Sequence, residues 1–266
     1  MSEDVITRVA PLGLRFVDDA TGAAVRDGLA VAWRVAGGAP VPALPTHADV
    51  FVVRGIPGLR ASEQGAGDED FWARPPARRA VAVEVGDPQG RYAAFSFAAD
   101  APARGLFAPP CAGRDATTVP LLPAATRSAP AGMALVRAEL RDAASGEPAA
   151  FAVLEVDAGR GGPQGRGFAD AEGRVAALLA WPRPPSALSG GPQALAAATW
   201  EVGVSVRSRA GVADGPFPDL CDVLGQPLAT PLAATGPDTP LRTATLAYGR
   251  ELVLRTAGET VLLVNR

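Results

Sequence analysis

Residues 136–156, VRAELRDAASGEPAAFAVLEV, decide the fold, because residues 14–31, LRFVDDATGAAVRDGLAV, repeat their pattern near the start of the chain. The two stretches align when Gly22 is set against Gly146 and one residue is inserted in the second half. The alignment pairs Leu14 with Ala138, Phe16 with Leu140, Asp18 with Asp142, Thr21 with Ser145, Leu29 with Leu154 and Val31 with Val156. One local structure is therefore expected twice.

Each copy reads as a strand, a polar turn and a second strand. Apolar and polar residues alternate on both sides of a segment that runs from Asp18 to Gly22 in the first copy and from Asp142 to Gly146 in the second, and its carboxylate and glycine favour a tight turn. A repeated β-module is a scaffold and does not specify a reaction. We therefore predict an all-β protein of two tandem antiparallel β-sandwiches joined by long Gly/Pro-rich loops.

The boundary between the two domains is expected near residue 127, because residues 124–131 carry prolines and lack an apolar pattern. The first domain, residues 1–126, includes an N-terminal arm over residues 1–11 and an acidic insertion loop over residues 61–78. The second domain is residues 127–266. A chain of 266 residues is long enough for two such cores.

Several strands follow from alternation. In the first half, Val81, Val83 and Val85 mark one face of a strand, Phe95 and Phe97 mark a face of its hairpin partner, and Trp33 lies in a core-facing pattern. A short edge strand is expected at residues 119–122, because Pro120 cannot donate to a sheet.

In the second half, hairpins are expected between residues 167–169 and 175–181, and between residues 245–254 and 260–264. Alternation at residues 200–206 gives a further strand, with Trp200 as a core residue. The long segment 210–240 is a crossover around Cys221, with a short helix at residues 219–224 capped by Asp219.

The charge and hydropathy of the chain exclude some classes of binding partner. The net charge is −3 and every basic residue is arginine, so no basic face for nucleic acid is implied. No run of about 18 apolar residues can span a membrane, and the start, MSEDVITRVAP, is not a secretion signal. We expect synthesis in the cytoplasm and no direct membrane insertion.

Reactive side chains are few. The chain has one histidine, His47, and two cysteines, Cys111 and Cys221, which are too far apart in sequence for a disulfide framework or zinc site and are expected to be unpaired thiols. The acidic run 68–70 reads as a solvated run, because adjacent residues on an extended chain do not converge. We expect no catalytic, cofactor-binding or metal site.

The glycine-rich stretch 158–166, AGRGGPQGR, superficially suggests phosphate binding. It lacks the Gly-Lys-Ser/Thr ending of a phosphate-binding loop, and no helix pattern follows it. A hairpin tip is the expected structure.

Aromatic side chains in polar loops are the candidate contact residues. Phe71 and Trp72 lie in the acidic insertion loop and either fold back on their own domain or anchor a partner protein, since aromatic residues dominate the centres of interfaces. Phe107 and Trp181 complete the interface candidates.

The repeated opening, together with the FADAEGRV phrase at residues 168–175, resembles the carboxypeptidase regulatory-like or transthyretin-like family. That resemblance implies a seven-stranded, immunoglobulin-like Greek-key sandwich with a non-catalytic role. A narrower resemblance, to accessory proteins of bacterial contractile injection systems, rests on the phrases PLGLRF (11–16), RGIPGLR (54–60), RGLF (104–107) and GRELVLR (249–255). It implies a structural subunit.

Two functions stay open. The first is a structural, non-catalytic subunit of a phage-tail-like contractile particle that binds neighbouring subunits, or further copies of itself, through edge strands and loops. Such a subunit is made in the cytoplasm and leaves with a released particle. The second is a free-standing ligand- or glycan-binding or adhesion module, in which Trp72 and Trp181 stack on a sugar ring.

Overall fold

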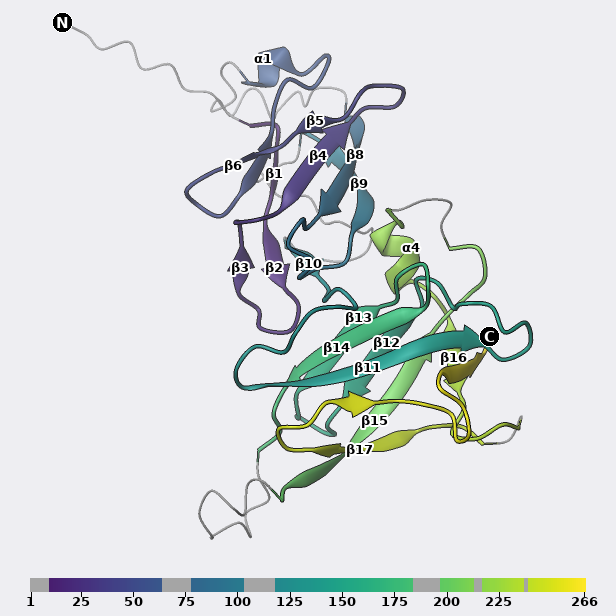
Figure 1. The fold of residues 1–266 in the computed structure, drawn as a ribbon. Coiled ribbons are helices and arrows are strands. Elements are labelled where there is room, and N and C mark those ends of the chain that lie inside the picture. The colour runs from purple at the N-terminus through teal and green to yellow at the C-terminus, as the bar shows by residue number, and fades with distance from the viewer. Residues whose placement is uncertain (1–9, 64–77, 103–117, 184–196, 213–216, 237–238) are drawn as a thin grey trace, which may run out of the picture. The chain divides into compact units, whose positions relative to one another are not determined.

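The computed structural model describes residues 10–63, 78–102, 118–183, 197–212, 217–236 and 239–266. Strands are the predominant regular structure among these residues, which also contain two short helices (Figure 1). The all-β expectation is therefore confirmed.

The chain forms two compact units that are interleaved in sequence. The first comprises Met1–Val17, Ala24–Pro88 and Phe95–Pro120, and the second comprises Asp18–Ala23, Gln89–Ala94 and Leu121–Arg266. Two short turns from the first half of the chain thus belong to the second unit.

The first half contributes ten strands and a helical turn to the described residues. They are β1 (Leu12–Leu14), β2 (Phe16–Asp18), β3 (Ala24–Val25), β4 (Ala30–Arg34), β5 (Val41–Pro42), β6 (Leu44–Pro45), β7 (Phe51–Val53), α1 (Arg60–Glu63), β8 (Arg79–Gly86), β9 (Phe95–Ala101) and β10 (Val119–Leu121). They form sheets in the orders β1-β7-β6, β10-β2-β3 and β5-β4-β8-β9.

The core of the first unit follows the predicted alternation. Val81, Val83 and Val85 of β8 are buried, and their intervening residues are not. The phenylalanines of β9, Phe95 and Phe97, are also buried, as predicted. Trp33 is buried on β4, and β10 is an end strand of its sheet, as Pro120 indicated.

The described residues of the second half form nine strands and one helix. They are β11 (Met133–Asp142), β12 (Val153–Asp157), β13 (Gln164–Phe168), β14 (Arg174–Ala180), β15 (Thr199–Arg207), α4 (Leu220–Leu224), β16 (Leu228–Pro231), β17 (Thr243–Ala247), β18 (Leu252–Val253) and β19 (Leu262–Asn265). Seven strands run in the order β13-β12-β15-β16-β19-β11-β14; β17 also pairs with β15, and β18 with β11.

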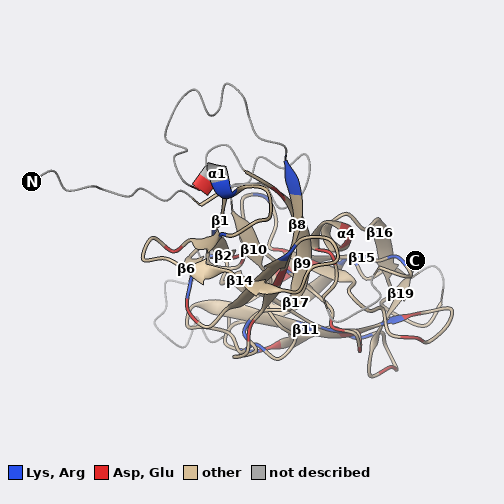
Figure 2. Cartoon of the chain, turned by 90° about the horizontal axis from the view of Figure 1, so that it is seen from above, with Lys and Arg blue, Asp and Glu red and all other residues tan. Residues whose placement is uncertain are grey.

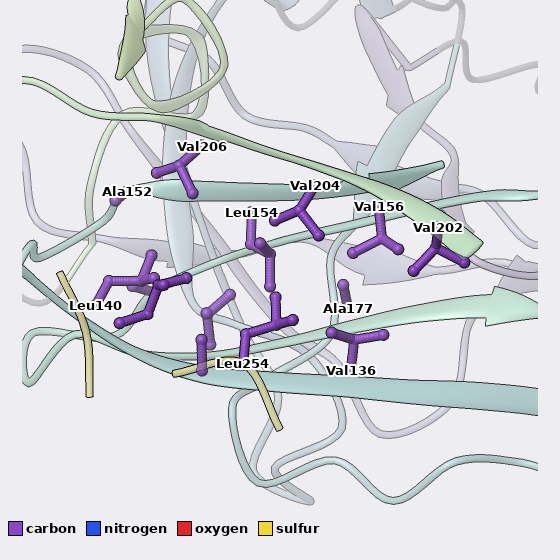
Figure 3. Packing of buried hydrophobic residues seen from close by; sticks show 14 of the residues in the cluster. Val136, Leu140, Ala152, Leu154, Val156, Ala177, Val202, Val204, Val206 and Leu254 are labelled. Atoms are coloured by element: carbon purple, nitrogen blue, oxygen red, sulfur yellow. The ribbon is translucent and has the colours of Figure 1, made fainter. Parts of the chain in front are cut away.

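The core of the second unit lies between two layers of these strands. Figure 3 shows Leu154 and Val156 of β12 and Val204 of β15 on one side, facing Val136 of β11 and Ala177 of β14 on the other. All of these side chains are buried. Burial of apolar side chains at about 25 cal/mol per Å² is the main force that holds the two layers together.

Strands β13 and β14, at the two ends of the strand order, approach each other closely. A Cβ atom on Gly165 would overlap the carbonyl oxygen of Leu178, and one on Gly167 would overlap that of Ala176. Gly165, inside the AGRGGPQGR stretch, and Gly167, directly after it, are therefore required by close packing. The predicted hairpin tip is confirmed, since β12 and β13 are antiparallel partners.

The two copies of the repeated turn make the same hydrogen bonds. In each, the carboxylate of Asp18 or Asp142 accepts bonds from the amides two and three residues later. The amides of Gly22 and Gly146 donate to the Asp carbonyls at 2.7 and 2.8 Å. Both glycines have positive φ, 71° and 73°, which glycine adopts without a Cβ clash. The alignment therefore locates equivalent turns.

Several pairings differ from expectation. The turn at residues 170–173 forms, but β13 pairs with β12 and β14 with β11, so the predicted hairpin between them is wrong. The predicted C-terminal hairpin is also wrong, because β18 and β19 both pair with β11, in parallel. These two parallel pairings contradict a wholly antiparallel fold. Alternation predicts that a segment is a strand but does not choose its partner.

The crossover 210–240 contains more structure than predicted. The helix capped by Asp219 is confirmed, with the Asp219 carboxylate accepting bonds from the amides of Cys221 and Asp222. Strand β16 follows it and was not expected, because prolines flank it.

Cys221 is disulfide-bonded, so the expectation of an unpaired thiol is wrong for this residue. The prediction was wrong because two cysteines that are far apart in sequence can lie close together in the folded chain. Cys111 lies outside the described residues.

Candidate functional site

A polar groove of about 590 Å³ lies on the outer face of the second unit. Strands β12, β13 and β15 are neighbours there, and alternation turns every second side chain outward. Its lining residues are Asp19, Glu155, Val156, Asp157, Gln164, Gly165, Arg166, Gly203, Val204, Ser205 and Arg242.

Strand register arranges the outward residues in two rows. Glu155 of β12 lies opposite Arg166 of β13 and Ser205 of β15. The next row has Asp157 on β12 and Gly203 on β15. Because Gly203 has no side chain, the second row is open where the first is filled.

An ion pair between distant parts of the chain forms one wall of the groove. The Arg166 guanidinium donates two hydrogen bonds to the Asp19 carboxylate, at 2.8 and 2.7 Å. These bonds raise the pKa of Arg166 further above its ordinary value, and the neighbouring Glu155 carboxylate adds to the effect. The paired geometry holds the turn that bears Asp19 against β13.

A second ion pair lies beside the first row. The Glu155 carboxylate accepts hydrogen bonds from the Ser205 hydroxyl at 3.2 Å and from the Arg207 guanidinium at 3.3 Å. Both charged side chains are 35% exposed. Glu155 is thus fixed in position and locally neutralised.

Two charged residues, Asp157 and Arg242, lie at the second row. Neither forms an ion pair among the described residues. The Asp157 carboxylate accepts bonds from the Gly159 amide at 2.7 Å and the Gln164 side-chain amide at 3.3 Å. The Arg242 backbone carbonyl accepts a bond from the Val204 amide at 2.9 Å, which places the residue beside β15.

A buried cluster supports the turn that carries Asp19. The Asp18 carboxylate forms an ion pair with Arg127 and accepts a hydrogen bond of 3.0 Å from the Tyr92 hydroxyl. The Asp18 and Arg127 side chains are only 5% and 9% exposed, and the Arg127 guanidinium lies 4.7 Å from the centre of the Tyr92 ring. The three residues join the turns 18–23 and 89–94 to the segment after residue 121.

Burial and neighbouring charge change the ionisation of this cluster. Burial alone raises the pKa of the Asp18 carboxyl, but the hydrogen bonds and charge of Arg127 and the Tyr92 hydroxyl outweigh it and hold that pKa below its ordinary value. Burial, then the Asp18 carboxylate, raise the pKa of Tyr92 to about 12. At neutral pH the cluster therefore contains a carboxylate, a guanidinium and a neutral phenol.

The groove offers hydrogen bonds and paired charges, among them the Ser205 hydroxyl bonded to the Glu155 carboxylate. Within the described part of the chain, no group of three His, Cys, Asp or Glu side chains could hold a metal ion. His47 is exposed in the first unit. Acidic and basic residues are interspersed over the described elements (Figure 2).

The predicted contact residues are described only in part. Phe71, Trp72 and Phe107 lie outside the described residues. Trp181 is half-buried, with its ring centre 5.8 Å from that of Trp200 and 4.9 Å from that of Tyr248. Trp200 is also half-buried, so the prediction that it is a core residue is wrong.

Sequence reasoning missed the groove. Its residues come from three strands, from the turn at residue 19 and from the segment before β17. The outward polar residues of β12 and β15 were visible as the polar half of each alternating pattern, but only strand pairing brings them together.

The chain matches no protein-family model, no curated protein and no solved structure. None of the described helices is long and apolar enough to cross a membrane. The fold and the groove therefore carry the functional interpretation.

Proposed function

We propose that this protein is a structural, non-catalytic subunit of a phage-tail-like contractile injection particle, built from two tandem transthyretin-like or immunoglobulin-like β-sandwiches. It contacts neighbouring subunits through edge strands and loops. Two features support the proposal: short sequence phrases that resemble those of accessory proteins of such particles, and a β-rich fold with open edges. Synthesis is cytoplasmic and is followed by release with the particle. The disulfide at Cys221 supports this later exposure, because disulfides persist mainly outside the reducing cytosol.

One segment, residues 41–45, carries the proposal. Its two strands, β5 and β6, are end strands of two different sheets. Val41 and Leu44 are 42% and 56% exposed. An end strand exposes unpaired backbone groups, and large apolar side chains on it add contact area for a partner. Pro42 and Pro45 interrupt the edge, which favours a specific partner over open-ended strand addition.

Co-purification with particle proteins tests the proposal. The tagged chain is expected to retain sheath, tube and baseplate proteins encoded by neighbouring genes. Val41→Glu combined with Leu44→Glu is expected to abolish that retention, because carboxylates replace the apolar contact. The control is Val253→Glu, which changes the same residue type at a similar exposure, 44%, in the second unit. Equal retention by the wild type and the double variant would contradict the proposed role of this edge.

A second candidate function, glycan binding, is favoured by the cluster of Trp181, Trp200 and Tyr248. Aromatic rings that are half-buried at the end of a core provide apolar faces on which a sugar ring can stack. A glycan array separates the two functions. Binding that is lost in Trp181→Ala, with no particle proteins retained by the wild type, would favour this second function.

A further inference from the structure

The charges that line the groove do not all find partners within the chain. Arg166 is paired with Asp19, and Glu155 is paired with Arg207. Asp157 and Arg242 form no ion pair among the described residues. The groove therefore presents one available anion and one available cation.

Gly203 separates these two charges and leaves open space between them. Asp157 lies opposite Gly203 on β15, and Gly203 lies opposite Thr243 on β17, directly after Arg242. Neighbouring strands are about 4.8 Å apart, so β12, which bears Asp157, and β17, which begins directly after Arg242, lie about 10 Å apart. A Cβ atom at residue 203 would meet only Asp157, at 3.6 and 3.9 Å, which is ordinary contact. Close packing does not require the glycine.

We propose that this groove binds an extended peptide segment of a neighbouring protein, one that carries a basic and an acidic side chain. The basic side chain pairs with Asp157 and the acidic one with Arg242. This inference rests on the proposed function, and it names the chemistry of one contact. The Gln164 amide and the Ser205 hydroxyl line the same groove and can bond to the peptide backbone.

Other ligand classes fit the groove less well. Three carboxylates, those of Asp19, Glu155 and Asp157, face two guanidiniums, so a polyanion such as a phosphate ester would be repelled. A free metal ion would need convergent carboxylates, and each of these three already accepts hydrogen bonds from protein donors.

Selection of phage-displayed random heptapeptides on the immobilised full-length chain tests the proposal. Enriched peptides are expected to contain both an acidic and a basic residue. Synthetic copies of these peptides, measured by fluorescence anisotropy, are then titrated onto the wild type and its variants.

Three variants separate binding from folding. Gly203→Val fills the groove and is expected to reduce peptide affinity at least tenfold with an unchanged melting temperature. Asp157→Asn keeps an acceptor for the Gly159 amide and removes the charge; Arg242→Gln removes the opposite charge. Each is expected to weaken binding about two- to fivefold, as for a partly exposed ion pair. The matched control, Thr199→Val, changes an exposed residue of β15 that does not line the groove.

Two results would overturn the proposal: no peptide is enriched, or the enriched peptides bind Gly203→Val as tightly as the wild type. Neither result depends on a particle, since the selection uses the purified chain alone. A failure here with retained sheath or baseplate proteins would remove the groove contact and leave the proposed function in place.

Discussion

The Arg166 guanidinium donates two hydrogen bonds to the Asp19 carboxylate, although the two residues are 147 positions apart in sequence. Arg166→Lys keeps the charge but cannot form both bonds, so we expect a loss of about 1–2 kcal/mol in the free energy of unfolding. Urea denaturation measures it. Arg174→Lys, at an ion pair whose side chains are 57% and 30% exposed, is the control and should leave the free energy of unfolding almost unchanged.

The two equivalent turns allow the buried ion pair to be measured separately from the turn itself. Asp18→Asn leaves Arg127 buried without a carboxylate, and we expect it to cost about 3 kcal/mol or more in unfolding free energy. Asp142→Asn alters the same turn hydrogen bonds, and its arginine, Arg266, is 21% exposed. We expect a cost of about 1 kcal/mol there. Equal costs for the two substitutions would show that the cluster contributes nothing beyond the turn.

Lowering the pH should remove the stabilisation of the fold that the ionised Asp18 carboxylate provides. Its pKa is lower in the folded protein than the ordinary value of 3.8. The stabilisation is therefore complete above pH 3.8 and is lost as the pH falls through the lower, folded value. Unfolding free energies measured from pH 6 downward should fall more steeply for the wild type than for Asp18→Asn. Parallel curves would contradict the depressed pKa.

Raising the pH should destabilise the fold by ionising Tyr92. The pKa of this residue is raised to about 12 in the folded protein from an ordinary value of 10.0. Because the neutral phenol is favoured on folding, its contribution is complete below pH 10 and is lost as the pH rises towards 12. The chain has two tyrosines, so Tyr248→Phe leaves Tyr92 alone to be followed by absorbance at 295 nm. A midpoint near pH 10 in the folded variant would refute the shift.

Glycines on β13 and β15, the two strands that flank β12, should differ in their tolerance of a methyl group. Gly165→Ala and Gly167→Ala each push a Cβ atom into a backbone carbonyl of β14, and we expect a cost of about 1–3 kcal/mol or more. Gly203→Ala meets no close contact and removes a flexible residue from a strand, so it should be neutral or stabilising by about 0.5–1 kcal/mol. Melting temperatures of the three variants test the contrast.

Local patterns predicted local structure well. The alternation in β8 and β9, the Asp219 cap and both copies of the Asp-to-Gly turn depend on neighbouring residues, and the structure contains each of them. Strand pairing was harder to predict. The parallel pairing of β11 with β18 and β19 brings together segments more than 100 residues apart, and alternation carries no information about such partners.

The lack of local information about distant partners also explains why the candidate site was not predicted from the sequence. Asp18 and Asp19 read as turn residues because their neighbours are typical of a turn, yet their distant partners, Arg127 and Arg166, decide their roles. A buried arginine in a proline-containing linker has no local signature. The four predicted contact residues, Phe71, Trp72, Phe107 and Trp181, stay predictions.

The interleaving of the two units restricts how this gene can be divided. The polypeptide passes from one unit to the other after residues 17, 23, 88, 94 and 120. Recombination that exchanged only codons 127–266 would separate Arg127 from Asp18 and Tyr92, and β13 from Asp19. The halves of this chain are therefore expected to be inherited, expressed and degraded as one piece.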